Sequence, residues 1–295
     1  MKGLFLRFLN LFMPRVTVRP EIGFAELLLY GWRFTVWQRY SLALRHLLGV
    51  EMKRPMSILD VGASGIGIAA YLDCARFEVY VTDLKATELK SVVRSNFYRL
   101  DARGHNALTL IERLVADANS LPFRDGAFDA VTAVAMLEHI PRTQRSRTAE
   151  ELMRVARHLV VAYLPAESEG RHFDILYNEA YERRFARHDI NTEEHLSAGH
   201  ASETELYELF PGSRLVAVQN GYVWQTTMIL ELYPVLRRLV GILYATILRW
   251  FDGRPPFYAR VLVWQVVGDQ QLTRRTPRRS TAYAREQRED KVAEA

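Results

Sequence analysis

The stretch that decides the fold is Ile58-Leu59-Asp60-Val61-Gly62-Ala63-Ser64-Gly65-Ile66-Gly67, an apolar strand that runs directly into a glycine-rich turn. A segment with helical character, residues 68–74, follows the turn. Because glycine lacks a Cβ, the backbone of such a turn approaches a ligand closely, and the start of the next helix offers unpaired N–H groups. The stretch therefore predicts a nucleotide-type binding site after the first strand of an α/β sheet.

On either side of this stretch, short apolar segments alternate with helical ones, as expected of a mostly parallel sheet covered by helices. The sequence predicts strands at residues 57–61, 78–82, 113–116, 128–134, 158–163, 214–219 and 258–267. It predicts helices at residues 68–74, 86–97 and 142–157. We therefore expect an α/β, Rossmann-like fold with a seven-stranded, mostly parallel sheet.

Composition and charge limit the classes of protein that the chain can belong to. Hydrophobic residues make up 49% and charged residues 25%, the balance of a folded globular protein. The net charge of +5 is concentrated at the two ends of the chain, and the evenly charged middle argues against a nucleic-acid groove. Cys74 is the only cysteine, so disulfides and thiolate metal cages are excluded within the chain. A cytoplasmic location, without an export signal, is the expectation.

The chain divides into three parts by pattern. Residues 1–50 read as an N-terminal amphipathic helical segment, residues 51–268 as the α/β domain and the polar residues 269–295 as a disordered tail. Within the domain, residues 165–200 lack a clean period and predict a loop-rich, lid-like excursion. Residues 225–256 predict an amphipathic helical insertion. Ser202 and Glu205 stand at capping-box spacing and predict a helix that ends near residue 210.

A carboxylate follows the second predicted strand. Asp83 comes directly after residues 78–82, at the carboxyl end of that strand. A carboxylate in this place can accept two hydrogen bonds from a ribose diol. The pair of signals, glycine-rich turn and following acid, indicates a nucleoside.

With these features the sequence resembles the class I S-adenosylmethionine-dependent methyltransferase superfamily, over roughly residues 57–165. Three further segments carry the likeness: Val115-Ala116-Asp117-Ala118, then Leu121-Pro122-Phe123 with Asp125-Gly126-Ala127-Phe128-Asp129, and Met136-Leu137-Glu138-His139-Ile140-Pro141. The resemblance implies S-adenosylmethionine as cofactor. It also implies that the last two strands form an antiparallel edge, which leaves one antiparallel strand in the predicted sheet.

The resemblance implies a role for each residue of the cofactor site. Asp60 helps to hold the methionine amino group, Asp83 with Leu84 binds the ribose, the Asp117 carboxylate binds the exocyclic amine of adenine, and the Ala118 N–H binds a ring nitrogen. The turn residues that pack under the cofactor are Gly62, Ala63, Ser64, Gly65 and Gly67. Ser64 stands where the family pattern places a glycine, which leaves the individual roles of Gly65 and Gly67 open.

Other interpretations use the same residues. Gly65-Ile66-Gly67-Ile68-Ala69-Ala70 also fits a dinucleotide fingerprint, so an NAD-type oxidoreductase is an alternative. That alternative does not explain Asp60, Asp117 or the lead-in to the fourth strand. Structural readings remain as well, with Asp60 capping a turn and Asp117 forming an Asp-Ala-Asn-Ser turn without a ligand.

Methyl transfer from a sulfonium needs alignment and exclusion of water, and needs a base only for some acceptors. His139, at the end of the fourth strand, has a suitable unperturbed pKa to take a proton from a hydroxyl acceptor. The equal alternative is that Glu138 and His139 cap the following helix and shape the pocket. A non-enzymatic S-adenosylmethionine-binding or membrane-associated scaffold is a further alternative.

Several charged residues crowd the lid-like excursion: His188, Asp189, Glu193, Glu194, His195 and His200. No pair of them has the one-turn spacing of a helical metal motif with a third ligand nearby, so we expect no metal site and instead a polar lid over the acceptor. Arg142, Arg145 and Arg147 predict a solvated helix face.

Two amphipathic basic segments predict contact with a membrane surface or a lipid-linked acceptor. Residues 3–12 and 232–251 each carry an apolar stripe beside arginines, and the longest uncharged run, 239–248, is about half of a bilayer span. Burial against the protein's own core and a homodimer seam are the alternatives for the second stripe. The acceptor itself is expected to be a small molecule, a glycan or a lipid-linked molecule, and not a nucleic acid.

Overall fold

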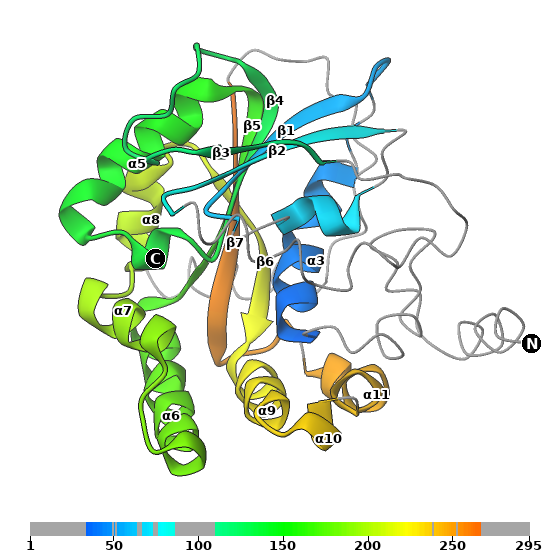
Figure 1. Cartoon of the computed structure of the whole chain (residues 1–295), viewed down its shortest axis with the longest axis vertical. Coiled ribbons are helices and arrows are strands. Elements are labelled where there is room, and N and C mark those ends of the chain that lie inside the picture. Colours follow the sequence, from blue (N-terminus) through cyan, green and yellow to red (C-terminus); the bar gives the residue numbers. More distant parts are fainter. Residues whose placement is uncertain are drawn as a thin grey trace, which may run out of the picture.

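The computed structural model describes residues 34–48, 50, 52–63, 67–72, 76–85, 110–237, 239–251 and 253–266. It consists of a central sheet with helices against both faces and a group of helices beyond one end of the strands (Figure 1). The predicted segments at residues 3–12, 86–97 and 269–295, together with Ser64 and Gly65 of the turn, lie outside the described residues.

The sheet contains seven strands in the order β3-β2-β1-β4-β5-β7-β6. Their bounds are β1 Met56–Val61, β2 Phe77–Asp83, β3 Leu110–Val115, β4 Phe128–Val134, β5 Ala156–Pro165, β6 Arg214–Asn220 and β7 Phe257–Gln265. Strands β1 to β5 pair in parallel, whereas β7 runs antiparallel to both β5 and β6. The predicted fold class, a mostly parallel Rossmann-like sheet with one antiparallel strand, is confirmed.

The parallel strands bring their carboxyl ends to one edge of the sheet. Asp60 near the end of β1 lies opposite Val81 of β2 on one side and Thr132 of β4 on the other. Every residue of β4 is buried, which explains its nearly continuous apolar sequence. Ligands of open α/β sheets bind beyond this edge, so the register alone indicates where to search for a site.

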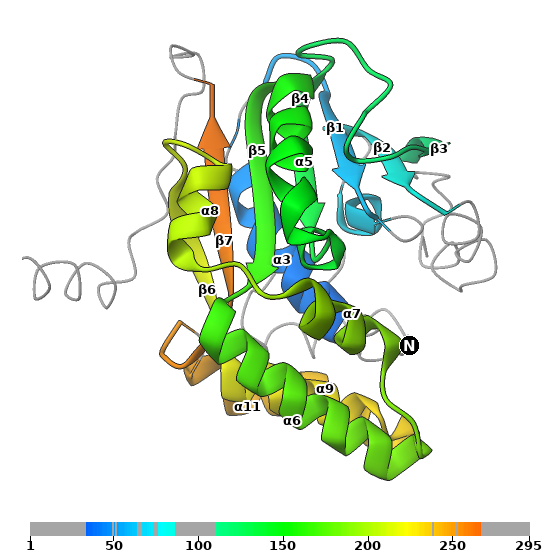
Figure 2. The same cartoon turned by 90° about the vertical axis from the view of Figure 1, so that its left-hand side faces the viewer.

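Two apolar clusters hold the helices against the sheet. On one face, α3 (Phe34–Leu48) packs on β4 and β5 and the short 3₁₀ helix η1 (Gly67–Tyr71) packs on β2, and on the other face lie α5 (Arg142–Val155) and α8 (Glu203–Leu209) (Figure 2). Ile58 and Leu59, adjacent in β1, belong to opposite clusters because strand side chains alternate. Because helices cover both faces of the sheet, β1 is buried on both sides.

Further helices lie beyond the carboxyl ends of the parallel strands (Figure 2). These are η4 (Leu137–His139), α6 (Glu167–Phe185), α7 (Ile190–Ala198), α9 (Gly221–Glu231), α10 (Pro234–Arg237), α11 (Val240–Thr246) and η5 (Leu248–Trp250). Helices α6 and α9 pack closely, since a Cβ on Gly221 would lie 1.8 Å from the ring of Phe173. Trp224 of α9 stacks on Tyr258 of β7 at 3.6 Å between ring centroids. These helices form one wall of the region beyond the sheet.

The prediction of a loop-rich excursion at residues 165–200 is wrong, because α6 and α7 occupy most of it. The buried side of α6 mixes Phe173 and Tyr177 with Asp174 and Asn178, which are 1% and 7% exposed. A helix is predicted from apolar residues at helical spacing, and polar residues on the buried face interrupt that spacing. The closing function of a lid stays a prediction.

The prediction of one apolar stripe along residues 232–251 is also corrected. The segment is broken into α10, α11 and η5, and α9 ends before Pro234, which has no N–H to continue it. Val240 and Tyr244 are buried, so part of the stripe packs on the core. Burial against the protein's own core was one of the alternatives for this segment. The rest is exposed: Tyr233, Val235, Leu236, Leu239, Ile247, Trp250 and Phe251.

Smaller differences concern the ends of elements. The predicted helix at 142–157 ends at Val155, and the next two residues already belong to β5. The helix predicted at 68–74 is the 3₁₀ helix η1. The capping box is confirmed, since the Ser202 hydroxyl accepts from the Glu205 N–H at 3.0 Å. Among the described helices, none is both long and apolar enough to cross a bilayer.

Candidate cofactor and acceptor site

The turn after β1 fits tightly against its neighbours. Gly62 has a φ of 71°, and a Cβ there would lie 2.2 Å from Cγ of Met136. Gly67 has a φ of 48°, and its Cβ would lie 2.0 Å from Oδ2 of Asp60. The N–H groups of Gly62 and Ala63 both donate to the Thr82 carbonyl, at 2.8 and 3.2 Å. The two glycines are therefore required by conformation as well as by space.

Asp60 lies beneath this turn and is fully buried. Its Oδ2 accepts the N–H of Ile68 at 2.7 Å, and its Oδ1 accepts the hydroxyl of Thr132 at 2.7 Å. Burial raises the pKa of Asp60 to about 6, against the opposite effect of these hydrogen bonds. The geometry is that of a carboxylate which holds the start of η1 and joins β1 to β4, and a role toward a methionine amino group stays a prediction.

Asp83 ends β2 at the same edge, and its Oδ1 accepts the Lys85 N–H at 3.2 Å. The neighbouring Leu84 is 65% exposed. The Asp83 carbonyl accepts the N–H of Ala116 at 3.1 Å, which brings the segment after β3 alongside the end of β2. The residues predicted to bind ribose and adenine are thus adjacent.

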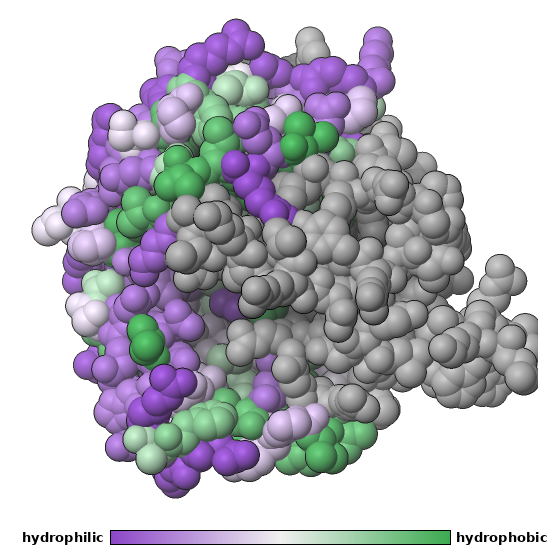
Figure 3. Space-filling view, in the orientation of Figure 1, coloured by the Kyte–Doolittle hydropathy of each residue, from purple (hydrophilic) through white to green (hydrophobic). Residues whose placement is uncertain are grey.

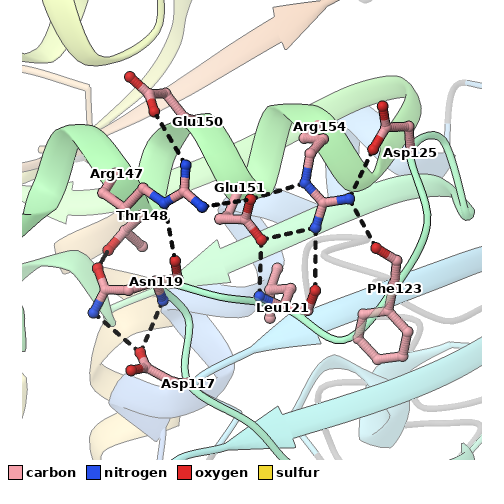
Figure 4. Close-up of polar contacts among 10 residues, drawn as sticks. All are labelled: Asp117, Asn119, Leu121, Phe123, Asp125, Arg147, Thr148, Glu150, Glu151 and Arg154. Carbon is pink, nitrogen blue, oxygen red and sulfur yellow. Dashed lines mark hydrogen bonds and ion pairs between the residues drawn. The ribbon is translucent and has the colours of Figure 1, made fainter.

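Asp117 is exposed and its Oδ1 is already engaged. It accepts both the backbone N–H and the side-chain amide of Asn119, at 2.8 and 3.0 Å (Figure 4). The Asp117 carbonyl accepts the Ser120 N–H. This is the turn that the structural reading of Asp117 expected. Ala118, the other residue predicted at the adenine, is half-buried.

Helix α5 anchors the segment that carries Asp117, a connection that sequence reasoning missed. Glu151 accepts the Leu121 N–H at 2.8 Å, and Arg154 donates to the carbonyls of Leu121 and Phe123 (Figure 4). The hydrogen bond from Arg154 lowers the pKa of Glu151 in spite of its burial. A charged helix face resembles a solvated one in sequence, so nothing in the pattern identifies these anchors.

Glu138 and His139 lie in η4, directly after β4. Glu138 is 4% exposed, and its Oε2 has no hydrogen-bond partner among the described residues. The Nδ1 of His139 lies 2.8 Å from Oε2 of Glu194, and its Nε2 lies 3.2 Å from Nε2 of His195. The structure thus brings a candidate base from η4 together with two residues of α7.

A buried polar cluster continues from His195. Oδ2 of Asp174 lies 3.0 Å from Nδ1 of His195 and 2.9 Å from Nε2 of His200, and its Oδ1 accepts the Tyr258 hydroxyl at 3.0 Å. Burial opposes the charge of Asp174, but the hydrogen bonds from His195 and His200 outweigh it and lower its pKa. The sequence analysis identified the two histidines and missed Asp174. The residues next to Asp174 in the sequence form no motif that indicates a functional side chain.

Asp174, His195 and His200 are also the described residues that come closest to a metal-binding arrangement, with one ligand atom each within 4.8 Å of one another. In the structure their facing atoms are joined by hydrogen bonds, and Asp174 accepts three donors. The structure thus supplies, from α6, the third ligand type that the sequence pattern lacks, and the expectation of no metal site stays a prediction.

The prediction that the arginines of α5 form a solvated face is wrong for Arg145. Its side chain is 1% exposed and donates to four carbonyls, those of Leu137, Ile140, Ala198 and Gly199. It also pairs with Glu205 at 3.3 Å. Arg142 and Arg147 are 54% and 59% exposed. The chain beyond α7 passes the start of α5, where Arg145 lies. Arg145 can therefore bind carbonyls of η4 and of the end of α7 at the same time.

The sheet order, the glycine turn and the acids near successive strand ends are the features of a Rossmann-like fold. Residues 59–163 match the family model of a methyltransferase domain. This match agrees with the resemblance of residues 57–165 to class I S-adenosylmethionine-dependent methyltransferases, whose cofactor is S-adenosylmethionine.

Solved structures of methyltransferases are similar to the chain at low sequence identity. An S-adenosylmethionine-dependent methyltransferase from Methanosarcina mazei is 19% identical, covering 72% of this chain and 93% of that one at a TM-score of 0.42. Magnesium protoporphyrin IX methyltransferase from Synechocystis, with bound S-adenosylhomocysteine, is 12% identical, covering 90% and 94% at a TM-score of 0.45.

Proposed function

We propose that the chain transfers a methyl group from S-adenosylmethionine to a small-molecule, glycan or lipid-linked acceptor. The observation that carries this proposal is the joining of the predicted contact segments at one sheet edge. The Gly62 N–H donates to the Thr82 carbonyl, and the Ala116 N–H donates to the carbonyl of Asp83. The methionine-side turn, the ribose acid and the adenine turn are therefore consecutive along this edge.

The residues present fit the cofactor. Gly62 has no Cβ to collide with Met136, so the turn packs tightly against the segment that follows β4. Carboxylates at Asp83 and Asp117 suit a ribose diol and an exocyclic amine, and the Ala118 N–H suits a ring nitrogen. Because Asp60 has no exposed surface, we propose that it acts on the methionine end through the turn that it holds.

Bound S-adenosylmethionine supplies a methyl group activated by the positive sulfur, and the protein supplies position and exclusion of water. Leu84 is one apolar side chain exposed at the edge. The chemical role of Glu138 and His139 depends on which group accepts the methyl. For a hydroxyl acceptor His139 takes a proton, and for an acceptor that is already a nucleophile the pair shapes the pocket.

The test of this function is methyl-donor turnover by the purified chain with fractions of cell extract, followed by mass analysis of the labelled product. The proposal predicts formation of S-adenosylhomocysteine together with a product that is heavier by one methyl group. Cofactor binding without turnover in any fraction would favour the non-enzymatic alternative. Reduction of NAD with an extract fraction would favour an oxidoreductase.

We further propose that the exposed part of residues 233–251 meets an anionic membrane surface, where a lipid-linked acceptor would be found. Figure 3 shows apolar residues gathered over α10 and α11 at the lower edge of the molecule. Val235, Ile247 and Trp250 are 76%, 52% and 62% exposed. Arg237, Arg238 and Arg249 accompany them in sequence, and this combination of apolar and basic residues suits an anionic leaflet better than a neutral partner.

A further inference from the structure

Four side chains from three helices form a chain of contacts that runs from the interior to the surface. Asp174 of α6, His195 of α7, His139 of η4 and Glu194 of α7 contact one another in that order, at 3.0, 3.2 and 2.8 Å between the facing atoms. Their side chains are 1%, 11%, 30% and 48% exposed. The two histidines thus connect a buried carboxylate with an exposed one.

The geometry fixes the number of protons on the two imidazole rings. Nδ1 of His195 faces the carboxylate of Asp174, and Nδ1 of His139 faces that of Glu194, so both nitrogens must donate. One further proton is required between the two facing Nε2 atoms. The two rings together therefore hold one positive charge, which belongs to the pair rather than to either residue.

The surroundings of the pair stabilise this charge. Asp174 and the buried Glu138 are negative, Arg39 of α3 is positive, Glu194 lies at the surface, and His200 and Tyr258 hold Asp174 from the far side. Burial alone would lower the pKa of His195, but its hydrogen bond to Asp174 and the charges of Glu138 and Asp174 raise it above the ordinary value. The shared proton therefore lies close to the buried carboxylate of Asp174.

We propose that Asp174 and His195 position His139 as the proton acceptor for the methyl acceptor, and that Glu194 returns the proton to solvent. This inference rests on the proposed methyltransferase function. When Nδ1 of His139 loses its proton, the remaining proton on Nε2 is fixed by His195, which leaves the lone pair on Nδ1 at the more exposed side. The role of His195 and Asp174 is the one that an orienting residue has toward a catalytic base.

The inference narrows the class of acceptor. Methylation of a hydroxyl or a neutral amine releases one proton for each methyl group transferred, and this proton passes to Nδ1 of His139. The pair then carries the single positive charge inferred from its contacts, and Glu194 accepts the hydrogen bond from Nδ1. A carboxylate acceptor releases no proton and has no need of such a path. We therefore expect a hydroxyl or amine acceptor.

The test is the ¹⁵N spectrum of the imidazole rings of the full chain, followed through a pH titration. The inference predicts that neutral His139 carries its proton on Nε2. His195→Leu should mix the two tautomers and lower the proton affinity of His139 about tenfold, which is about one pH unit in its midpoint. His195→Gln, whose amide oxygen can accept from Nε2–H, should restore the tautomer but not the proton affinity.

Two further variants and a control complete the test. Asp174→Asn should lower the proton affinity of the pair, and because Asp174 is buried, Glu194→Gln at the exposed end tests the same path without disturbing the core. His188→Gln is the matched control, since His188 pairs with Glu182 and Glu193 outside the chain of contacts. It should leave the titration of His139 unchanged.

Three results would overturn the inference. They are neutral His139 protonated on Nδ1, a His139 midpoint that is the same in all variants, and a stoichiometric metal ion in the purified protein that is lost in Asp174→Asn. The spectrum requires neither cofactor nor acceptor. Failure of this path is therefore distinguishable from failure of the methyltransferase function, which cofactor binding and turnover test.

Discussion

At the scale of single residues, Gly67 is the position where the turn tolerates least change. Its φ is positive and its Cβ would collide with Asp60 Oδ2. Gly67→Ala should cost about 1–2 kcal/mol for the left-handed conformation and about 1–3 kcal/mol more for the collision, and should weaken cofactor binding. Gly212→Ala is the control, because Gly212 also has a positive φ but no atom lies within 4 Å of its Cβ position. Equal losses in urea unfolding would contradict the packing argument.

Asp60 gives a pH dependence with a definite sign. Its pKa is about 6 in the folded protein and lower in the unfolded chain, so the folded state binds the proton more tightly. The contribution of Asp60 to stability therefore rises as the pH falls through 6. Between pH 7 and pH 5 wild type should gain about 1 kcal/mol relative to Asp60→Asn. Urea unfolding of both proteins at the two pH values measures this gain in stability. A difference between the two proteins that is constant or reversed with pH would contradict the raised pKa of Asp60.

The sequence predicts individual residues where the chemistry is local. Gly62 and Asp83 are found because a turn and a strand end are continuous in sequence. Asp174 is not found, since its partners His195, His200 and Tyr258 come from α7, the following loop and β7. Contacts between segments that are far apart in the sequence produce no local motif from which they could be predicted.

At the scale of elements, α5 is held by one buried arginine. Arg145→Met should lower the free energy of unfolding by at least about 2 kcal/mol, because several buried carbonyls lose their donor. Arg147→Met, on the same helix but 59% exposed, should change it by less than about 1 kcal/mol. Denaturant unfolding compares the two variants, and similar losses would mean that Arg145 does not join η4 to α7.

Elements with a clean period are predicted well from the sequence and those with mixed faces are not. The seven strands and α5 appear near their expected bounds because their apolar residues face the two core clusters. Helices α6 and α7 were expected as loops because Asp174, Asn178 and His195 stand on their buried sides. The stripe at 232–251 divides between core and surface because the chain bends around Pro234.

At the scale of the whole molecule, the exposed apolar end predicts reversible membrane binding. Wild type should sediment with anionic but not with neutral liposomes, and less so as salt rises. Ile247→Ser with Trp250→Ser should reduce sedimentation, as should Arg237→Glu with Arg238→Glu. The control is Tyr207→Ser, because Tyr207 is 37% exposed on α8. Protein that stays in the supernatant with anionic liposomes at low salt excludes the membrane, and a concentration-dependent dimer would assign the patch to a second copy.

The architecture of the whole molecule was predictable because it depends on alternation of strands and helices rather than on particular contacts. The position of the proposed cofactor edge follows from the same pattern. The proposed acceptor side is not predictable from sequence, since α6, α7, α9 and β7 meet there only through the packing of distant segments (Figures 1 and 2).

The central claim is that the edge formed by the turn after β1, Asp83 and Asp117 binds S-adenosylmethionine, and calorimetry with S-adenosylhomocysteine tests it most directly. Wild type should bind at about micromolar affinity, as expected of a buried nucleoside with several polar contacts. Asp83→Ala should lose about 1–3 kcal/mol of binding free energy. Glu150→Ala, at an exposed position on α5, should bind as wild type does. No heat of binding from folded wild type, or tighter binding of NAD, would contradict the assignment.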